Sequence, residues 1–136
     1  MLQTRHLSLL VLFMLPLCSR GDSANEAIAR ATAAIQAAAP RAQADPAHPI
    51  FHVTAPAQWI NDPNGPIFYK GYYHLFYQLH PFSDESGPKY WGHVRSRDLV
   101  KWEHLPVALA PSGEAGETEI WSGCCTINGL GQPMAF

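Results

Sequence analysis

The sequence predicts an all-β fold for most of the chain. Fourteen of its 15 aromatic residues follow residue 50. In the same region, short runs of strand-forming residues alternate with turns rich in Gly, Pro, Asn, Asp and Ser. Short strands at this spacing are typical of an antiparallel sandwich, barrel or propeller. We therefore expect residues 45–136 to form the folded part, which is small for an independent core of this kind.

Each strand is predicted from the residues that lie between two turns. Lys70 and Gly71 predict a turn, so residues 66–69 and 72–79 should pair as a hairpin. Further strands are predicted at residues 90–95, 102–105, 119–127 and 132–136. The turns that separate them are predicted at residues 83–87, 96–98, 111–116 and 128–131.

Residues 1–23 have the pattern of a secretory signal peptide. Arg5 precedes an apolar run over residues 7–17, and residues 21–23 offer a small-x-small cleavage site. The run is shorter than the about 20 residues that span a bilayer, so we expect no stable membrane anchor. Two alternatives are a buried core helix and a lipoprotein modified at Cys18, although a Leu precedes this Cys where a small residue is needed. The expected location is secreted or periplasmic.

Residues 24–44 form an alanine-rich segment of their own. They contain 11 alanines, with Ile28 and Ile35 seven positions apart. Alanine has the highest helix propensity, and Pro40 and Pro46 should close the segment. We predict a short helix or a partly ordered linker here and assign it no chemistry.

Charge and cysteine content exclude several classes of function. Nine Lys and Arg against 11 Asp and Glu give a net charge of −2, so no basic surface for nucleic acid is expected. Cys124 and Cys125 are adjacent, which disfavours an ordinary disulfide, and we expect both to be small buried apolar side chains. No Cys-x-x-Cys spacing occurs. We therefore expect no metal site and no cofactor.

The most informative motif is Trp-Ile-Asn-Asp-Pro-Asn-Gly at residues 59–65. Pro63 favours an extended Asp62, and Asn64 and Gly65 suit the end of a tight turn. One interpretation is a plain turn in which Asp62 caps backbone amides. The other is a carboxylate held rigidly for chemistry on a sugar, because this and later motifs supply groups that stack on and hydrogen-bond a sugar ring: Trp59, Gln78, Trp91, His93 and Trp121.

Five motifs in this order resemble the N-terminal region of glycoside hydrolase family 32, which contains invertases, levanases and inulinases. They lie at residues 59–65, 73–78, 91–93, 96–106 and 121–123. The resemblance implies a five-bladed β-propeller, often followed by a β-sandwich, and a retaining attack on β-D-fructofuranosides such as sucrose or fructans. It also implies that residues 45–136 form the first blade and part of the second, so that the propeller is incomplete in this chain.

By position in these motifs, the resemblance assigns Asp62 as the nucleophile. Five further positions match family residues that bind the sugar or belong to the segments lining its pocket: Trp59, Asn61, Gln78, Trp121 and Ser122. Trp91 and His93 match a motif that we interpret as structural. Ser86 stands where many members have a pocket Trp, which leaves the length of the substrate open.

Retaining hydrolysis needs two carboxyl groups about 5–5.5 Å apart. In the family the acid/base is a Glu beside a Cys, and a stabilising Asp lies in an Arg-Asp-Pro motif. Neither Glu-Cys nor Arg-Asp-Pro occurs in these 136 residues. We therefore expect an N-terminal piece of a longer enzyme, inactive on its own. The alternatives are a non-catalytic sugar-binding remnant and a fructosyltransferase of the same architecture.

Overall fold

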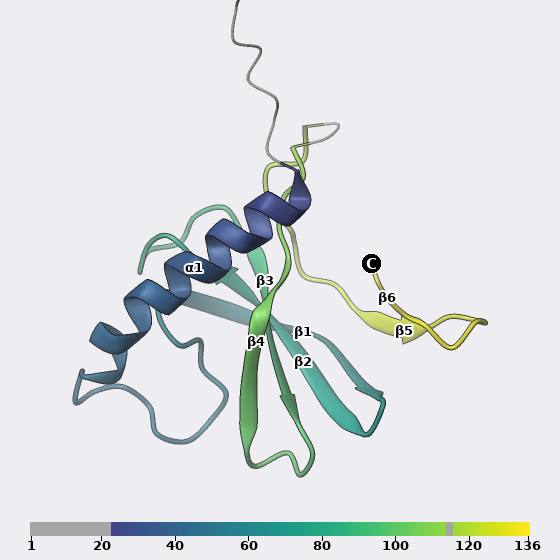
Figure 1. Cartoon of the computed structure of the whole chain (residues 1–136), viewed down its shortest axis with the longest axis horizontal. Coiled ribbons are helices and arrows are strands. Elements are labelled where there is room, and N and C mark those ends of the chain that lie inside the picture. The colour runs from purple at the N-terminus through teal and green to yellow at the C-terminus, as the bar shows by residue number, and fades with distance from the viewer. Residues whose placement is uncertain (1–22, 114–115) are drawn as a thin grey trace, which may run out of the picture.

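The computed structural model describes residues 23–113 and 116–136. This part contains one helix and six strands: α1 (Ala24–Gln43), β1 (Trp59–Tyr69), β2 (Tyr72–His80), β3 (Tyr90–Ser96), β4 (Trp102–Leu109), β5 (Cys125–Ile127) and β6 (Pro133–Ala135). β1 to β4 form one antiparallel sheet in chain order, and β5 and β6 form a separate hairpin (Figure 1). Of the predicted signal peptide, all but Ser23 lies outside the described residues.

The predicted β1–β2 hairpin is confirmed. Tyr69 pairs with Tyr72 across a turn at Lys70 and Gly71. Both turn residues have a positive φ, 48° and 81°, which is the backbone that a two-residue type I′ turn requires. β3 and β4 also form where they are predicted, although β4 extends further than expected.

The tight turn predicted at residues 62–65 is wrong. These residues continue β1, whose pairing with β2 changes register between Ile60 and Pro63 and again after Asn64. Pro63 has no N–H for the ladder, and Gly65 has a φ of 47°, so the strand bulges instead of turning back. A bulge redirects side chains from the regular alternation of a strand, and this one contains the carboxylate of interest.

The long strand predicted at residues 119–127 is wrong in its first part, because only β5 is regular strand. The backbone before β5 is bonded to separate parts of the sheet instead of one neighbouring strand. Ile120 N–H donates to the Lys89 carbonyl at 2.8 Å, and the Gly123 carbonyl accepts from Gly65 N–H at 3.2 Å. These bonds hold an irregular segment across the edge of the sheet.

The two cysteines are more exposed than the sequence predicts. Cys124 is exposed and Cys125 is half-buried, and both are free thiols. Cys124 precedes β5 and Cys125 is its first residue, and most residues of the β5–β6 hairpin are exposed. The expectation of two buried side chains is therefore wrong, because this small hairpin has too few neighbours to cover them.

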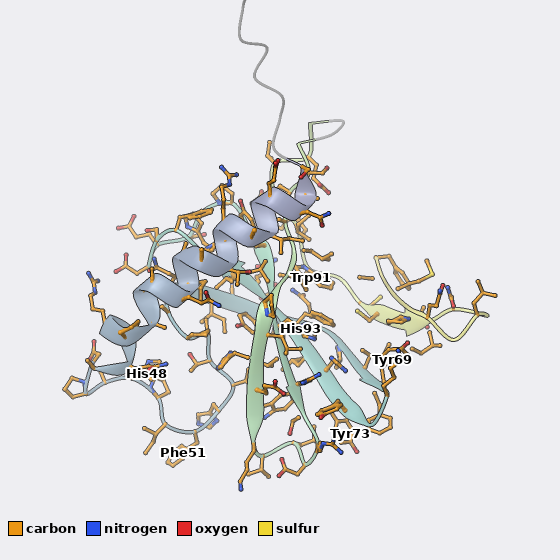
Figure 2. All side chains as sticks on the ribbon, viewed as in Figure 1. His48, Phe51, Tyr69, Tyr73, Trp91 and His93 are labelled. Carbon is orange, nitrogen blue, oxygen red and sulfur yellow. The ribbon has the colours of Figure 1, made fainter. Side chains whose placement is uncertain are left out.

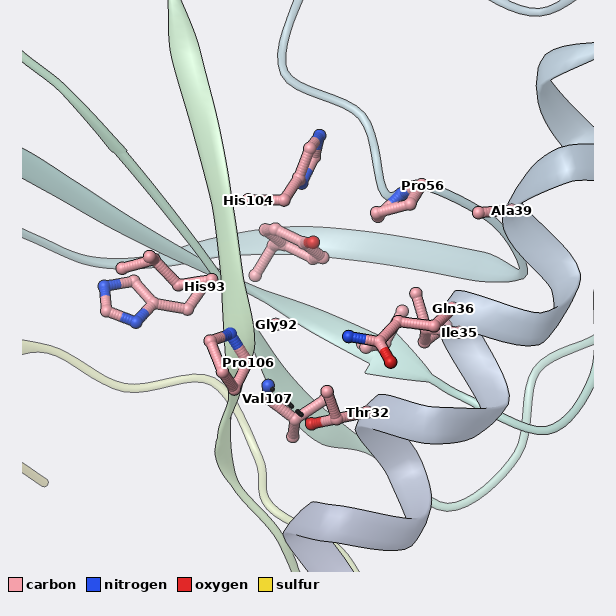
Figure 3. A pocket seen from close by; sticks show the side chains of 13 residues that line it. Thr32, Ile35, Gln36, Ala39, Pro56, Gly92, His93, His104, Pro106 and Val107 are labelled. Carbon is pink, nitrogen blue, oxygen red and sulfur yellow. Dashed lines mark hydrogen bonds between the residues drawn. The ribbon is translucent and has the colours of Figure 1, made fainter.

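α1 forms in the alanine-rich segment. Ser23 and Glu26 make a capping box at its start, and the helix runs past Pro40 instead of ending there. Thr32 Oγ1 accepts from the Val107 N–H at 3.1 Å, which ties the helix to β4 (Figure 3). Its buried face contacts the core through Ala27, Ala31 and Ile35. Neither α1 nor any other helix in the described residues is long and apolar enough to cross a membrane.

The four-stranded sheet is covered differently on its two faces. Tyr77 and Leu79 of β2 point toward α1, where a cavity of about 160 Å³ remains (Figure 3). Phe76, directly before Tyr77, points to the opposite face, where β5 and β6 lie. Gly92 lets the Tyr77 ring approach β3, because a Cβ there would overlap the ring. The irregular segment before β5 therefore lies on the Phe76 side, away from α1.

Candidate active site

Asp62 lies exposed in the bulged part of β1. Its Oδ2 accepts a hydrogen bond from the Ser122 hydroxyl at 2.7 Å. Ser122 Oγ in turn accepts one from Gln78 Nε2 at 2.8 Å. Gln78 is only 3% exposed on β2, so this chain of bonds starts at a fixed, buried amide and ends at an accessible carboxylate. Three of the predicted site residues therefore meet from three separate segments.

Asn64 and Gly65 hold the backbone that carries Ser122. Asn64 Oδ1 accepts from the Gly123 N–H at 3.3 Å, and Gly65 N–H donates to the Gly123 carbonyl at 3.2 Å. Asn64 is buried, and its Nδ2 has no hydrogen-bond partner among the described residues. At Gly65 the positive φ and the nearby Cys125 Sγ, which a Cβ would overlap, both favour glycine. The residues predicted as a turn act as a clamp on a distant segment.

Two tryptophans extend the site toward β3. Trp91 is buried, and its Nε1 donates to the Trp121 carbonyl at 2.9 Å. Figure 2 shows Trp91 and His93 where the strands converge. Trp121 is 64% exposed, and Lys89 Nζ lies over its ring, 4.5 Å from the centroid. Trp91 thus fixes the backbone next to Ser122, and Trp121 presents an aromatic surface beside it.

The other two predicted site residues precede Asp62 on β1. Asn61 is exposed directly beside it in the sequence. Trp59 is half-buried at the start of the strand, where its backbone N–H donates to the Ser83 carbonyl at 3.1 Å. The structure therefore joins Gln78, through Ser122, to Asp62 by hydrogen bonds, whereas Asn61 and Trp59 are connected to Asp62 only as members of the same strand.

The two described glutamates before Trp121 bind residues other than Asp62. Glu119 forms an ion pair with Lys89 at 2.8 Å. Glu117 accepts from the hydroxyl and the N–H of Ser112, both at 2.8 Å. Glu114 lies outside the described residues. Across residues 23–113 and 116–136, no group of three or more His, Cys, Asp or Glu is placed to hold a metal ion.

Aromatic rings and histidines support Trp91 from the same face of the sheet. Phe76 lies 5.7 Å from Trp91 and stacks on His93 at 4.3 Å between ring centroids. His93 Nε2 and His74 Nδ1 lie at hydrogen-bond distance, 2.9 Å. Burial, together with the nearby His74 and Arg95, lowers the pKa of His93 to about 4. Burial also lowers the pKa of His74.

We expect the free energy of unfolding to fall as the pH falls from 6.5 toward 4. The pKa of His93 is lower in the folded chain than in the unfolded chain. In this window the unfolded chain therefore binds a proton at His93 that the folded chain does not bind. Above this window the ring is neutral in both states and adds no pH dependence. Urea unfolding at a series of pH values measures the slope, and His93→Gln should flatten it. A variant with the wild-type slope would contradict this assignment.

The sequence predicts neither the clamp made by Asn64 nor the contacts of Lys89. An Asn inside a turn-like motif and a Lys just before a predicted strand are the only signals that it offers. Neither signal identifies a partner, because the partners lie 59 and 30 residues away along the chain.

Most of the chain after α1 matches a known protein family. The model of the glycosyl hydrolases family 32 N-terminal domain matches residues 52–136. The chain belongs to this family. The match includes all strands and the whole Asp62–Ser122–Gln78 arrangement, and it excludes α1.

Individual family 32 members are similar over the same region. The chain is 57% identical over 81 residues to the sucrose-6-phosphate hydrolase of Zymomonas mobilis, covering 60% of this chain and 16% of that protein. It is 54% identical over 80 residues to the levanase of Bacillus subtilis, covering 59% of this chain and 11% of that protein. The chain thus spans about a sixth or less of the length of these relatives.

Solved structures of family 32 proteins have the same fold. The β-fructofuranosidase of Bombyx mori matches with a TM-score of 0.56 and 43% identity, over 77% of this chain and 20% of that one. Fructan 1-exohydrolase IIa of Cichorium intybus matches with a TM-score of 0.59 and 44% identity, over 62% of this chain and 16% of that one. These matches confirm the predicted all-β propeller fold, with one four-stranded blade and part of a second.

Proposed function

We propose that the protein hydrolyses β-D-fructofuranosides by a retaining mechanism, with Asp62 as the nucleophile. The observation that carries the proposal is the exposed Asp62 carboxylate, held by the Ser122 hydroxyl at 2.7 Å in a chain that belongs to family 32. A plain turn cap would direct its oxygens to backbone N–H groups. Asp62 instead binds a side chain that is itself held from the core by Gln78.

In the proposed reaction, an Asp62 oxygen forms a bond to the anomeric carbon as the glycosidic oxygen leaves with a proton from a second carboxyl group. Water then attacks the same carbon and gives that group its proton, which releases fructose and the free carboxylate. The Ser122 hydroxyl orients the attacking carboxylate. The exposed Asn61 donates to a hydroxyl group of the fructosyl ring, and the buried Gln78 holds Ser122 in place.

The second carboxyl group is the part of the mechanism that the described residues do not supply near Asp62. The two glutamates closest in sequence to Ser122 bind Lys89 and Ser112. In the family pattern, this group is the Glu beside a Cys in a later motif. Retaining chemistry places it about 5–5.5 Å from the nucleophile.

The substrate that we propose is a neutral fructoside, sucrose or a fructan. Solved family 32 proteins include one in complex with 1-kestose and one in complex with sucrose. In this chain, Trp121 and Trp59 supply flat apolar surfaces, and Asn61 supplies an exposed amide group. This mixture suits a sugar ring, whose hydroxyl groups and C–H faces need both kinds of partner.

The activity is tested on the complete gene product that carries these residues. Incubation with sucrose, raffinose, inulin and levan should release fructose from at least one of them, and maltose should remain intact. Sugar binding without turnover would contradict hydrolysis and favour a binding protein. Fructose appearing only in longer saccharides would instead identify a transferase.

We also propose that the protein is exported to the periplasm or the medium. The support is the sequence of residues 1–23, with a cation, a short apolar run and small residues before the expected cleavage site. Ser23 caps α1, so a mature chain that keeps this residue keeps its capping box. N-terminal sequencing should find the mature chain starting within a few residues of Ala24. A cytoplasmic protein that retains residues 1–23 would refute export.

A further inference from the structure

The segment that carries Ser122 depends on contacts with other segments, because it has no regular structure before β5. Three of these contacts converge on one residue, Lys89. Its ammonium pairs with the Glu119 carboxylate at 2.8 Å, and its carbonyl accepts from the Ile120 N–H at 2.8 Å. The same ammonium lies 4.5 Å from the centroid of the Trp121 ring. Lys89 therefore contacts three consecutive residues.

The charge of Lys89 is directed inward. Its side chain is 17% exposed and that of Glu119 is 24% exposed, so the ion pair is partly withdrawn from water. An ammonium that is already paired and placed over an aromatic ring is not available to an anionic ligand. This arrangement argues against a role in binding a phosphate and for a role in fixing the ring.

The Trp121 ring has one face under the ammonium and remains mostly exposed. With the residue 64% accessible and Lys89 over one face, the other face is open to a ligand. An indole held in one pose offers a flat apolar surface for the C–H groups of a sugar.

We propose that Lys89 is a positioning residue that sets the pose of Trp121 and thereby the binding of the fructoside. The inference rests on the proposed function. Lys89 affects substrate binding more than the chemical step, because hydrogen bonds that do not involve Lys89 hold Ser122 in place. Gln78 binds its hydroxyl, and Trp91 and Asn64 bind the backbone on either side of it.

The test is the kinetics of Lys89→Met in the complete gene product. Met keeps an unbranched apolar side chain of similar length and removes the charge. We expect KM for the best fructoside to rise about tenfold and kcat to stay within about twofold, as loss of one cation–π contact and its ion pair predicts. Lys89→Arg should restore KM, since Arg can form both contacts.

A matched control exists at the other end of β3. Arg95 pairs with Glu103 at 2.7 Å and lies 4.5 Å over the Tyr72 ring, which is the same combination of contacts away from the site. Arg95→Met should leave KM unchanged. In a Trp121→Ala background, Lys89→Met should add nothing further to KM, because the group it positions is gone.

Two outcomes would overturn the inference in an active enzyme: an unchanged KM in Lys89→Met, or the same tenfold increase in the Trp121→Ala background. If the wild type hydrolyses no fructoside, the proposed function fails, and fluorine NMR still decides the positioning role. With 5-fluorotryptophan, the Trp121 signal, assigned by Trp121→Phe, should shift in Lys89→Met and not in Arg95→Met. An unshifted signal would show that Lys89 does not position the ring.

Discussion

Replacing Asp62 by Asn should lower kcat on fructosides by at least about 10³-fold, or roughly 4 kcal/mol of barrier, with little change in melting temperature. The Asn side chain keeps the shape of Asp and an oxygen that can accept from Ser122. It lacks the negative charge that attacks the anomeric carbon. Steady-state kinetics and thermal unfolding of the complete gene product carrying this substitution measure the two effects.

Asp98 provides the matched control, because it is a carboxylate that does act as a cap. Its Oδ1 accepts from the backbone N–H groups of Val100 and Lys101 at 2.9 and 2.8 Å in the loop after β3. Asp98→Asn should leave kcat unchanged. An Asp62→Asn enzyme within about tenfold of the wild type would place Asp62 in the same structural class and leave the nucleophile unassigned.

Removing the hydroxyl of Ser122 should have the next largest effect. In Ser122→Ala, Asp62 loses the donor at 2.7 Å and Gln78 loses the acceptor of its buried amide. Hydrogen bonds to charged groups contribute about 1.5–3 kcal/mol, so kcat/KM should fall by about 10- to 100-fold. The fall should lie mainly in kcat, because the lost bond orients the nucleophile.

Ser112→Ala is the control for this substitution, since the Ser112 hydroxyl also donates to a carboxylate, that of Glu117, at 2.8 Å. It should leave the kinetics unchanged. Wild-type kinetics in Ser122→Ala would mean that the contact with Asp62 has no part in the reaction. Equal losses in both variants would indicate a general effect on stability instead.

Much of the four-stranded sheet could be predicted from the sequence, because local patterns specify it. Lys70 and Gly71 predict a two-residue turn, and both residues have the positive φ that such a turn requires. The alternation in β2 then assigns Tyr77 and Leu79 to one face and Phe76 to the other. These patterns depend on residues that are close together in the chain, so they can be read from a single sequence.

The parts that could not be predicted depend on contacts between distant residues. The motif around Asp62 has the composition of a tight turn, and pairing with β2 makes it a bulged strand instead. The segment at Ser122 has the composition of a strand, and bonds to Lys89 and Asn64 hold it irregular. α1 has helical composition, but nothing in the sequence indicates that Thr32 would bind the backbone of β4.

The most direct test of Asp62 as nucleophile is mass spectrometry of the complete gene product, quenched with acid during turnover of a fructoside and digested. A retaining mechanism forms a covalent fructosyl ester on its nucleophile. We predict a peptide containing Asp62 that carries the mass of one fructosyl group, absent from the Asp62→Asn enzyme. A fructosyl group on a peptide without Asp62 would contradict the assignment.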